Sequence, residues 1–179
     1  MVLYFITGNK NKLKEIRSMI PNIRKIDMDL DEIQEIDPKK IIRAKMNEAL
    51  KHHDGEFIIE DTSLYLDCLN GLPGPLIKWF MKTIGNEGLS DIALKSGNTK
   101  ATAKTIIGYA RSNKKTYFFT GSVKGNIIRP KGKTSFGWDP IFQPKGYKKS
   151  FAQMTRKQKN EISMRKKAAK KLKKFLESQ

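Results

Sequence analysis

The stretch Phe57–Pro75, FIIEDTSLYLDCLNGLPGP, constrains the fold more than any other part of this sequence. It begins with an apolar run that is typical of a buried strand, and the acids Glu60 and Asp61 follow at once. Acids held at the end of a rigid strand can bind a hard cation through their oxygen atoms. Alternatively, both acids only cap a strand at the surface, because Asp and Glu are mostly exposed. The turn residues Asn70–Pro75 close the stretch and lead into a helical pattern.

A second candidate for ligand binding follows the first predicted strand, Val2–Ile6. The next residues, Thr7–Lys12, contain a glycine and lead into a predicted helix through Leu13 and Ile16. A strand, a glycine-containing loop and a helix N-terminus together form an anion site, because backbone N–H groups point outward there and the helix dipole favours negative charge. The spacing of a Walker A loop is missing, so the pattern predicts an anion without identifying it.

The remaining secondary structure follows from periodicity and capping signals. In the first half of the chain we predict a strand over Ile23–Leu30, a helix over Lys39–His52 that begins after Asp37-Pro38, and a short helix capped by Ser90. Two long strands follow over Lys100–Ala110 and Lys115–Arg129, joined through Arg111–Lys114 as an antiparallel hairpin. Near the end we predict a helix start with capping-box spacing at Thr155 and a last helix over Met164–Glu177 capped by Ser163.

The segment Ser135–Phe142, SFGWDPIF, has an unusual composition for a loop. Two aromatic rings, a glycine and a carboxylate lie within the four residues from Phe136 to Asp139. A ring that stacks on a planar ligand, and an acid that hydrogen-bonds its edge, would give this composition. An aromatic plug over the end of a sheet would give it equally well, and both interpretations stay open.

The formal net charge of +18 on 179 residues needs an explanation. From Gln143 to the end there are 13 Lys or Arg and 2 Glu, a net +11 in 37 residues. Nucleic acid, an anionic small substrate and a lysine-rich source proteome are all compatible with this excess. The last predicted helix has an apolar stripe opposite its lysines, so those lysines are expected to lie on a solvated face.

Length and composition predict one soluble globular domain over residues 1–179, with 38% hydrophobic and 30% charged residues. The single cysteine, Cys68, excludes an internal disulfide and fits a reducing compartment, so we expect a cytoplasmic location. No apolar run approaches the ~18 residues of a membrane span. The N-terminal apolar run has no basic region before it, which argues against a signal peptide.

Four sequence blocks, in this order, make the chain similar to the inosine triphosphate pyrophosphatase family, the noncanonical purine nucleoside triphosphate pyrophosphatases. They are TGNKNK at Thr7–Lys12, IIEDTSLYLDCLNGLPGP at Ile58–Pro75, SFGWDPIFQP at Ser135–Pro144 and FAQMTRKQKNEISMR at Phe151–Arg165. The resemblance implies a single α/β domain with a long, bent mixed β-sheet flanked by helices, and two lobes around a central nucleotide cleft. It also implies a homodimer that uses Mg²⁺ to hydrolyse ITP, dITP and XTP to the monophosphate and pyrophosphate, which removes deaminated purines from the nucleotide pool.

The resemblance also implies roles for individual residues. Asp61 matches the catalytic acid that binds metal or activates water, and Glu32 matches the first metal carboxylate. The phosphate-binding loop matches Thr7, Asn9 and Lys12, with Gly8 between them, and two further phosphate ligands match Lys45 and Lys159. The base pocket matches Phe136, Trp138 and Asp139, the purine-reading arginine matches Arg165, and Thr62, Gly137 and Met164 complete the substrate-binding set.

Elementary chemistry agrees with these roles at two points. A triphosphate carries about four negative charges, so several convergent lysines would act as a clamp. Mg²⁺ prefers one or two carboxylates together with phosphate oxygens and water, which Glu32, Asp61 and, as a further candidate, Glu60 could provide. The sequence departs from the family at Met164, where the family usually has histidine, and at Gln153, where it often has glutamate.

The alternative function is a basic nucleic-acid-binding protein without catalysis, which the net charge and the lysine-rich last helix would suit. The chain lacks the interleaved basic and exposed aromatic residues of an RNA-binding motif. The sequence therefore favours a small nucleotide as the partner over a nucleic acid, and it favours no membrane partner.

Overall fold

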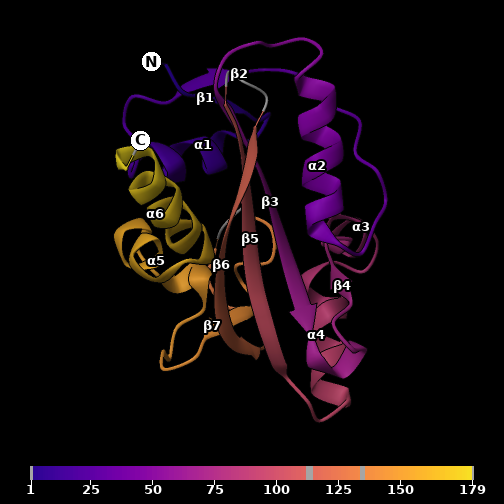
Figure 1. Ribbon diagram of the computed structural model, residues 1–179. Coiled ribbons are helices and arrows are strands. Elements are labelled where there is room, and N and C mark those ends of the chain that lie inside the picture. Colours follow the sequence, from indigo (N-terminus) through magenta and orange to yellow (C-terminus); the bar gives the residue numbers. More distant parts are fainter. Residues whose placement is uncertain (1, 112–114, 134–135, 179) are drawn as a thin grey trace. The chain divides into compact units, whose positions relative to one another are not determined.

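Strands and helices alternate from residue 4 to residue 83, and three successive strands follow later in the chain (Figure 1). The computed structural model describes residues 2–111, 115–133 and 136–178. The strands are β1 (Tyr4–Ile6), β2 (Arg24–Ile26), β3 (Phe57–Leu66), β4 (Pro73–Gly74), β5 (Lys100–Ala110), β6 (Thr116–Ile127) and β7 (Phe142–Pro144). The helices are α1 (Lys10–Arg17), α2 (Pro38–Ala49), α3 (Ile77–Thr83), α4 (Gly85–Lys95), α5 (Arg156–Ile162) and α6 (Met164–Glu177), with single 3₁₀ turns η1 (Asp67–Leu69) and η2 (Phe151–Gln153).

The described strands form one mixed sheet. Its order is β2-β1-β3-β5-β6-β7, and β4 pairs with β3. β1 is parallel to β2 and to β3, whereas β4 is antiparallel to β3 and β7 is antiparallel to β6. The predicted α/β class with a mixed sheet flanked by helices is therefore confirmed. The predicted bend of the sheet and the cleft between two lobes stay predictions.

The contacts among its residues divide the chain into two compact units. Unit 1 comprises Met1–Thr62, Thr105–Gly121 and Met164–Gln179, and unit 2 comprises Ser63–Lys104 and Ser122–Ser163. β3, β5 and β6 each contribute residues to both units. The assignment of residues 1–179 to one domain stays a prediction.

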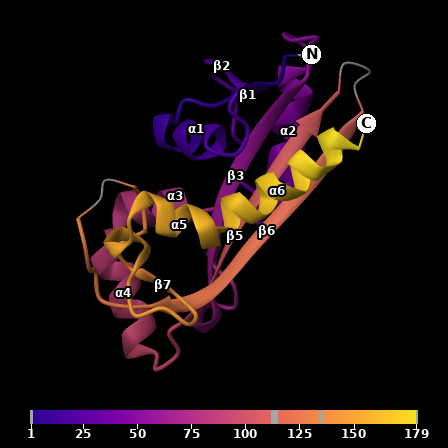
Figure 2. The same ribbon diagram turned by 90° about the vertical axis from the view of Figure 1, so that its left-hand side faces the viewer.

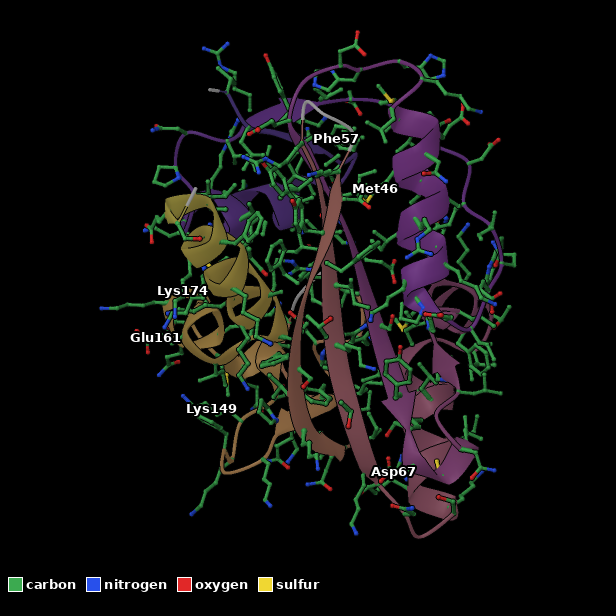
Figure 3. All side chains as sticks on the ribbon, viewed as in Figure 1. Met46, Phe57, Asp67, Lys149, Glu161 and Lys174 are labelled. Atoms are coloured by element: carbon green, nitrogen blue, oxygen red, sulfur yellow. The ribbon has the colours of Figure 1, made fainter. Side chains whose placement is uncertain are left out.

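The core of unit 1 consists of two apolar clusters on opposite faces of its strands. Phe5 of β1 and Ile58 of β3 belong to the cluster shared with α1 and α6, whereas Ile6 and Phe57 belong to the cluster shared with α2. Successive strand residues point to opposite faces, so α1 and α6 cover one face and α2 covers the other (Figures 1 and 2). Figure 3 shows Met46 pointing from α2 toward the sheet.

Two glycines in the strands of unit 1 let the helices lie close to the sheet. A Cβ atom on Gly108 of β5 would lie 2.4 Å from the sulfur of Met46 in α2. A Cβ atom on Gly121 of β6 would lie 2.0 Å from the carbonyl oxygen of Met164 and 2.6 Å from the nitrogen of Ala168, both in α6. Side chains at these two positions would push the helices outward, because real Cβ contacts are not this short.

Local signals predicted several element starts correctly. Asp37 caps α2 and accepts a hydrogen bond from the backbone nitrogen of Lys39 at 2.9 Å. Thr155 and Gln158 form the predicted capping box at the start of α5. The bounds of α6 agree with the prediction, and Ser163 precedes it in an extended conformation while closing α5.

Three other predictions need correction. β2 covers only Arg24–Ile26 instead of Ile23–Leu30, although Met28 and Leu30 still pack against the α2 cluster. Ser90 does not cap a helix, because α4 already begins at Gly85; Ser90 is buried inside α4 and donates to the carbonyl of Ile128 at 3.0 Å. The helix predicted to reach His52 ends at Ala49.

The two long strands predicted in the second half of the chain are neighbours in the sheet as β5 and β6. β6 ends at Ile127 rather than at Arg129. Most of the predicted hairpin link, residues 112–114, lies outside the described residues. None of the helices that the structure describes combines the length and the apolar character that crossing a membrane requires.

Candidate active site

The loop between β1 and α1 is fixed by its own side chains. Thr7 Oγ1 accepts a hydrogen bond from the backbone N–H of Asn9 at 3.1 Å. Asn9 caps α1, since its Oδ1 accepts from the backbone N–H groups of Asn11 at 2.9 Å and of Lys12 at 3.1 Å. Gly8 is exposed, and no heavy atom lies within 4 Å of the place a Cβ atom would take. The cap therefore uses two N–H groups of this helix terminus, while the space beside Gly8 is open.

Glu60 and Asp61 are neighbours in β3 but belong to opposite faces of the sheet. Ile58 lies in the cluster of α1 and α6, and Ile59 lies in the cluster of α2. The alternation of side chains along a strand continues this pattern, so Glu60 faces the first cluster and Asp61 faces the second. The two acids consequently meet different partners.

The first set of partners is a buried ion-pair network, here called the Glu60 cluster, made of Glu15, Glu60, Thr62 and Arg165. Arg165 donates from Nε to Glu60 Oε2 at 2.5 Å and from Nη2 to Glu60 Oε1 at 3.2 Å. Its Nη1 donates to Glu15. Thr62 donates its hydroxyl to Glu60 Oε1 at 2.6 Å and accepts from Arg165 Nη2 at 3.2 Å. Lys12 joins the edge of the cluster, with Nζ 3.3 Å from Glu60 Oε1.

The charges of the Glu60 cluster compensate one another. Burial disfavours the carboxylate of Glu60, but Arg165 and Lys12 outweigh it and lower the pKa of Glu60 from 4.5 to about 2. Burial also disfavours the guanidinium of Arg165, which is 1% exposed, but Glu60 and Glu15 raise its pKa above the usual value. Buried charges are tolerated when they are paired and hydrogen-bonded in this way.

On the other face, the charges of Glu32 and Lys45 act on Asp61, and these three residues are here called the Asp61 group. Lys45 Nζ in α2 lies 2.7 Å from Oε1 of Glu32, in the segment before that helix. Burial raises the pKa of Asp61 above 3.8; Lys12 and Lys45 lower it, whereas Glu60 and Glu32 raise it. The net result is a rise, so the positive charges around Asp61 do not fully compensate its burial.

The carboxylates of the Asp61 group could hold a divalent metal ion together with a phosphate. Among the residues that the structure describes, no group of three or more His, Cys, Asp or Glu side chains could hold a metal ion by itself. Mg²⁺ needs only one or two protein carboxylates when phosphate oxygens and water complete its shell. Glu32 and Asp61 supply that number, and the pKa of Asp61 responds to the charge of Glu32.

In unit 2, three of the predicted site residues form another group, here called the Lys159 group: Phe136, Asp139 and Lys159. Lys159 Nζ lies 2.6 Å from Asp139 Oδ2, and both side chains are buried. The same ammonium group lies 4.2 Å from the ring centroid of Phe136. Lys159, predicted as a phosphate ligand, is thus in contact with residues predicted for the base pocket.

The loop around Gly137 shows how the Lys159 group is held. Gly137 has φ 55°, a conformation that favours glycine. Asn86 at the start of α4 donates from Nδ2 to the carbonyl of Gly137 at 3.2 Å. Trp138 is 7% exposed, and its ring centroid lies 5.5 Å from that of Phe142 and 6.4 Å from that of Phe151. Trp138 therefore packs against these two rings in the core of unit 2, and its role in a base pocket stays a prediction.

Met164 is buried at the start of α6. Because Gly121 has no side chain, this end of the helix comes close to β6. The neighbouring residue, Arg165, belongs to the Glu60 cluster. A contact between Met164 and a purine base stays a prediction.

Sequence reasoning missed Glu15, Thr105 and Asn86. Glu15 lies on the buried side of α1 with Leu13 and Ile16, and a charged residue on an apolar helix face is a signal that could have been used. Thr105 Oγ1 lies 2.8 Å from Thr62 Oγ1. Asn86 and Gly137 are 51 residues apart, and no local pattern indicates their hydrogen bond.

Similarity to known proteins was found at the level of family, sequence and structure. The Ham1 family model matches residues 3–175. The chain belongs to the Ham1 family. It is 37% identical to the inosine triphosphate pyrophosphatase of Schizosaccharomyces pombe over 99% of this chain and 96% of that protein. It is 40% identical to the protein of the same name from Scheffersomyces stipitis over 98% of this chain and 97% of that one.

Solved structures of Ham1 proteins share the fold. The HAM1 protein of Coxiella burnetii has a TM-score of 0.85 at 22% identity and covers 100% of both chains. The Staphylococcus aureus Ham1 protein has a TM-score of 0.77 at 25% identity, with 98% of both chains covered. The predicted resemblance to the inosine triphosphate pyrophosphatases is thus confirmed at the level of family.

Proposed function

We propose that this Ham1 protein hydrolyses ITP, XTP and dITP to the nucleoside monophosphate and pyrophosphate, with Mg²⁺ as the metal. The observation that carries the proposal is the Asp61 group, within a chain that is 37% and 40% identical, along nearly its whole length, to two inosine triphosphate pyrophosphatases. Removal of deaminated purines from the nucleotide pool is the physiological role that this reaction would serve.

Unit 1 carries the groups that phosphate chemistry needs. Lys12 and Lys45 would bind phosphate oxygens, and Gly8 would let them come close to the backbone. Glu32 and Asp61 would hold Mg²⁺, which supplies charge neutralisation at the phosphate oxygens when bound.

Asp61 is the proposed general base. It accepts a proton from water while the water oxygen forms a bond to the α-phosphorus. The bond from that phosphorus to the bridging oxygen breaks, and its electron pair leaves with pyrophosphate.

We place Lys159 on the base side of the substrate, because its contacts include Phe136 and Asp139. An ammonium group can only donate hydrogen bonds, so Lys159 would favour the 6-oxo group of hypoxanthine or xanthine over the 6-amino group of adenine. An unpaired buried polar group costs about 1–3 kcal/mol, which corresponds to roughly ten- to hundredfold rejection of ATP. The predicted contact of Arg165 with the purine remains part of the proposal, although its described bonds go to Glu15, Glu60 and Thr62.

Pyrophosphate release from ITP with Mg²⁺, compared with ATP, tests the proposal directly. We expect hydrolysis of ITP that stops when the metal is chelated, and at least tenfold lower kcat/KM for ATP. Absence of ITP hydrolysis by a folded protein would contradict the proposal and support the nucleic-acid-binding alternative.

We further propose a homodimer. Three large apolar side chains between residues 72 and 84 of unit 2, Leu72, Trp79 and Ile84, are exposed by 44%, 46% and 42%, and large exposed apolar side chains can serve a protein–protein contact. Light scattering on the wild type and on Trp79→Lys tests it, with a dimer and a monomer as the expected results. A cytoplasmic location is proposed on the single cysteine, which suits a reducing compartment.

A further inference from the structure

The proposed reaction does not use most of the positive charge on unit 1. Nine cations lie on two helices: six lysines of α6 and three basic residues of α1. This surface, here called the basic face, is made of Lys10, Lys14, Arg17, Lys166, Lys167, Lys170, Lys171, Lys173 and Lys174. All of them are exposed except Lys166, which is half-buried. The Asp61 group lies on the other side of the sheet, with α2.

Packing fixes the direction in which these side chains point. α1 buries Leu13 and Ile16, and α6 buries Ala168, Ala169 and Leu172, all in one apolar cluster. The two helices also contact each other directly. Because each helix turns its apolar side inward, most of the cations of both are left on the outer surface. Two of them also donate to backbone carbonyls of unit 1: Lys171 Nζ to Thr120 at 2.7 Å and Arg17 Nε to Ile23 at 3.3 Å. Figure 3 shows Lys174 extending outward from α6.

The spacing on α6 aligns the lysines into a stripe. Lys167, Lys170, Lys171 and Lys174 are related by steps of three and four residues, which places them on one side of a helix. At 1.5 Å per residue, Lys166 and Lys174 are separated by about 12 Å along the helix axis. A linear anion with evenly spaced charges could therefore contact several of these lysines at once.

Acidic residues are segregated from the basic face. In the described part of unit 1, the exposed acids other than Glu177 all lie between Asp27 and Asp54, in the segment that includes α2. Glu177, at the end of α6, lies 3.8 Å from Lys173. Glu15 of α1 is buried against Arg165. Glu15 and Glu177 are thus the acids that α1 and α6 contain, so the two helices carry a large excess of positive charge.

We propose that the basic face binds the phosphate backbone of a double-stranded nucleic acid, without reading its sequence. Charge complementarity carries the proposal, since duplexes present regularly spaced phosphates and helix-borne lysines are suited to bind them. This inference stands apart from the proposed hydrolysis of nucleotides. It also differs from the sequence-based expectation for the lysines of α6, which were expected only to face solvent. That expectation did not include the cations of α1.

The surroundings of the basic face favour this partner over a lipid surface or a single strand. The exposed large apolar residues of unit 1, within the described chain, are Val2, Ile33 and Ile36, none of which belongs to α1 or α6. A membrane-binding helix needs apolar side chains to insert. Binding of single strands relies on aromatic side chains that stack on bases, and neither helix exposes one. The duplex backbone needs only cations.

Fluorescence anisotropy with labelled duplexes of about 20 base pairs, one of DNA and one of RNA, tests the proposal over about 50 to 200 mM salt. The variant Lys14→Gln/Lys170→Gln/Lys174→Gln removes three charges from the basic face. We expect at least tenfold weaker binding, and a plot of log K against log salt that is shallower by about 3 for DNA, since each phosphate contact contributes about 0.9 to the slope. Binding of only one duplex type would still support the proposal and would identify the natural partner.

The matched control is Lys39→Gln/Lys40→Gln/Lys51→Gln, which removes the same charge from exposed lysines on and after α2. It should keep wild-type affinity within about twofold, because the salt slope counts only phosphates that are contacted. Equal losses in both variants, no binding by the wild type, or binding to anionic vesicles but not to duplexes would overturn the proposal. ITP hydrolysis is measured in parallel and should be unchanged in both variants, so a failure here is separate from a failure of the proposed activity.

Discussion

Glu60 and Asp61 share one strand and one type of functional group, yet their environments differ in kind. Glu60 lies in a network where Arg165, Lys12 and Thr62 compensate its burial, and its pKa falls to about 2. Asp61 is on the opposite face, where Lys45 is already paired with Glu32, and burial raises its pKa. A carboxylate whose charge is fully compensated contributes to stability, whereas one whose charge is undercompensated is available for proton transfer.

The strongest test of this difference is Asp61→Asn. Loss of the proposed base and metal ligand should lower kcat for ITP by about 10²-fold or more. The same change removes an ionised carboxylate that burial disfavours, so the free energy of unfolding should rise at neutral pH. Steady-state kinetics and urea unfolding measure the two effects. Retention of more than about a tenth of kcat, ~1.4 kcal/mol of barrier or less, would show that Asp61 is not the base.

Glu60→Gln should lower the free energy of unfolding, whereas Asp61→Asn should raise it. It leaves the buried guanidinium of Arg165 with Glu15 as its only carboxylate in the cluster, and breaking a buried pair costs about 3–5 kcal/mol. Urea unfolding should show this loss. The control is Glu48→Gln, which breaks an exposed pair with Lys51 and should leave the unfolding midpoint unchanged. A Glu60→Gln protein as stable as the wild type would mean that the Glu60 cluster does not stabilise the fold.

Lowering the pH should change the stability contributions of Glu60 and Asp61 in opposite directions. The pKa of Glu60 is lowered in the folded state, so its stabilisation is fully present above about pH 4.5 and is lost as the pH falls toward about 2. At 1.36 kcal/mol per pKa unit, this amounts to about 3 kcal/mol. The pKa of Asp61 is raised in the folded state, so its protonation at low pH stabilises the folded state. Urea unfolding of the wild type and of Glu60→Gln between pH 5 and pH 2 checks this, and parallel pH curves for the two proteins would contradict it.

Lys12 links the two acids, since it contacts Glu60 and lowers the pKa of Asp61. Lys12→Ala should therefore shift the acidic limb of the pH–rate profile to higher pH. It should also raise KM for ITP about tenfold, the value of one charge-assisted hydrogen bond, with much less effect on inhibition by IMP. Kinetics with both nucleotides measure the two effects. Equal losses for ITP and IMP would place Lys12 away from the terminal phosphates.

Local signals in the sequence were sufficient for much of the fold. Asp37 and Thr155 begin their helices as predicted, because a cap involves residues only a few positions apart. The start of α4 at Gly85 was missed, since the preceding helix ends at Thr83 and only Ile84 separates the two, with Gly85 at φ 64°. Ser90 is a capping residue by type, but its hydroxyl bonds to Ile128 in another segment.

The candidate site was less accessible from sequence. That Glu60 and Asp61 point to opposite faces follows from strand alternation and could have been predicted. The pairing of Arg165 with Glu15 joins residues 150 positions apart, and the contact of Lys159 with Asp139 depends on how a loop folds back on a helix. Such partners are set by tertiary packing, which a single sequence does not reveal.

The ion pair between Lys45 and Glu32 has a consequence for how ligands would enter the Asp61 group. A phosphate that takes over Lys45 releases Glu32, and a released carboxylate attracts a cation. Conversely, a cation that takes over Glu32 releases an ammonium group that attracts a phosphate. Each ligand then removes the competitor of the other, and thermodynamic reciprocity requires the two enhancements to be equal. Nucleotide and metal should consequently bind as cooperative partners, each weakly when alone.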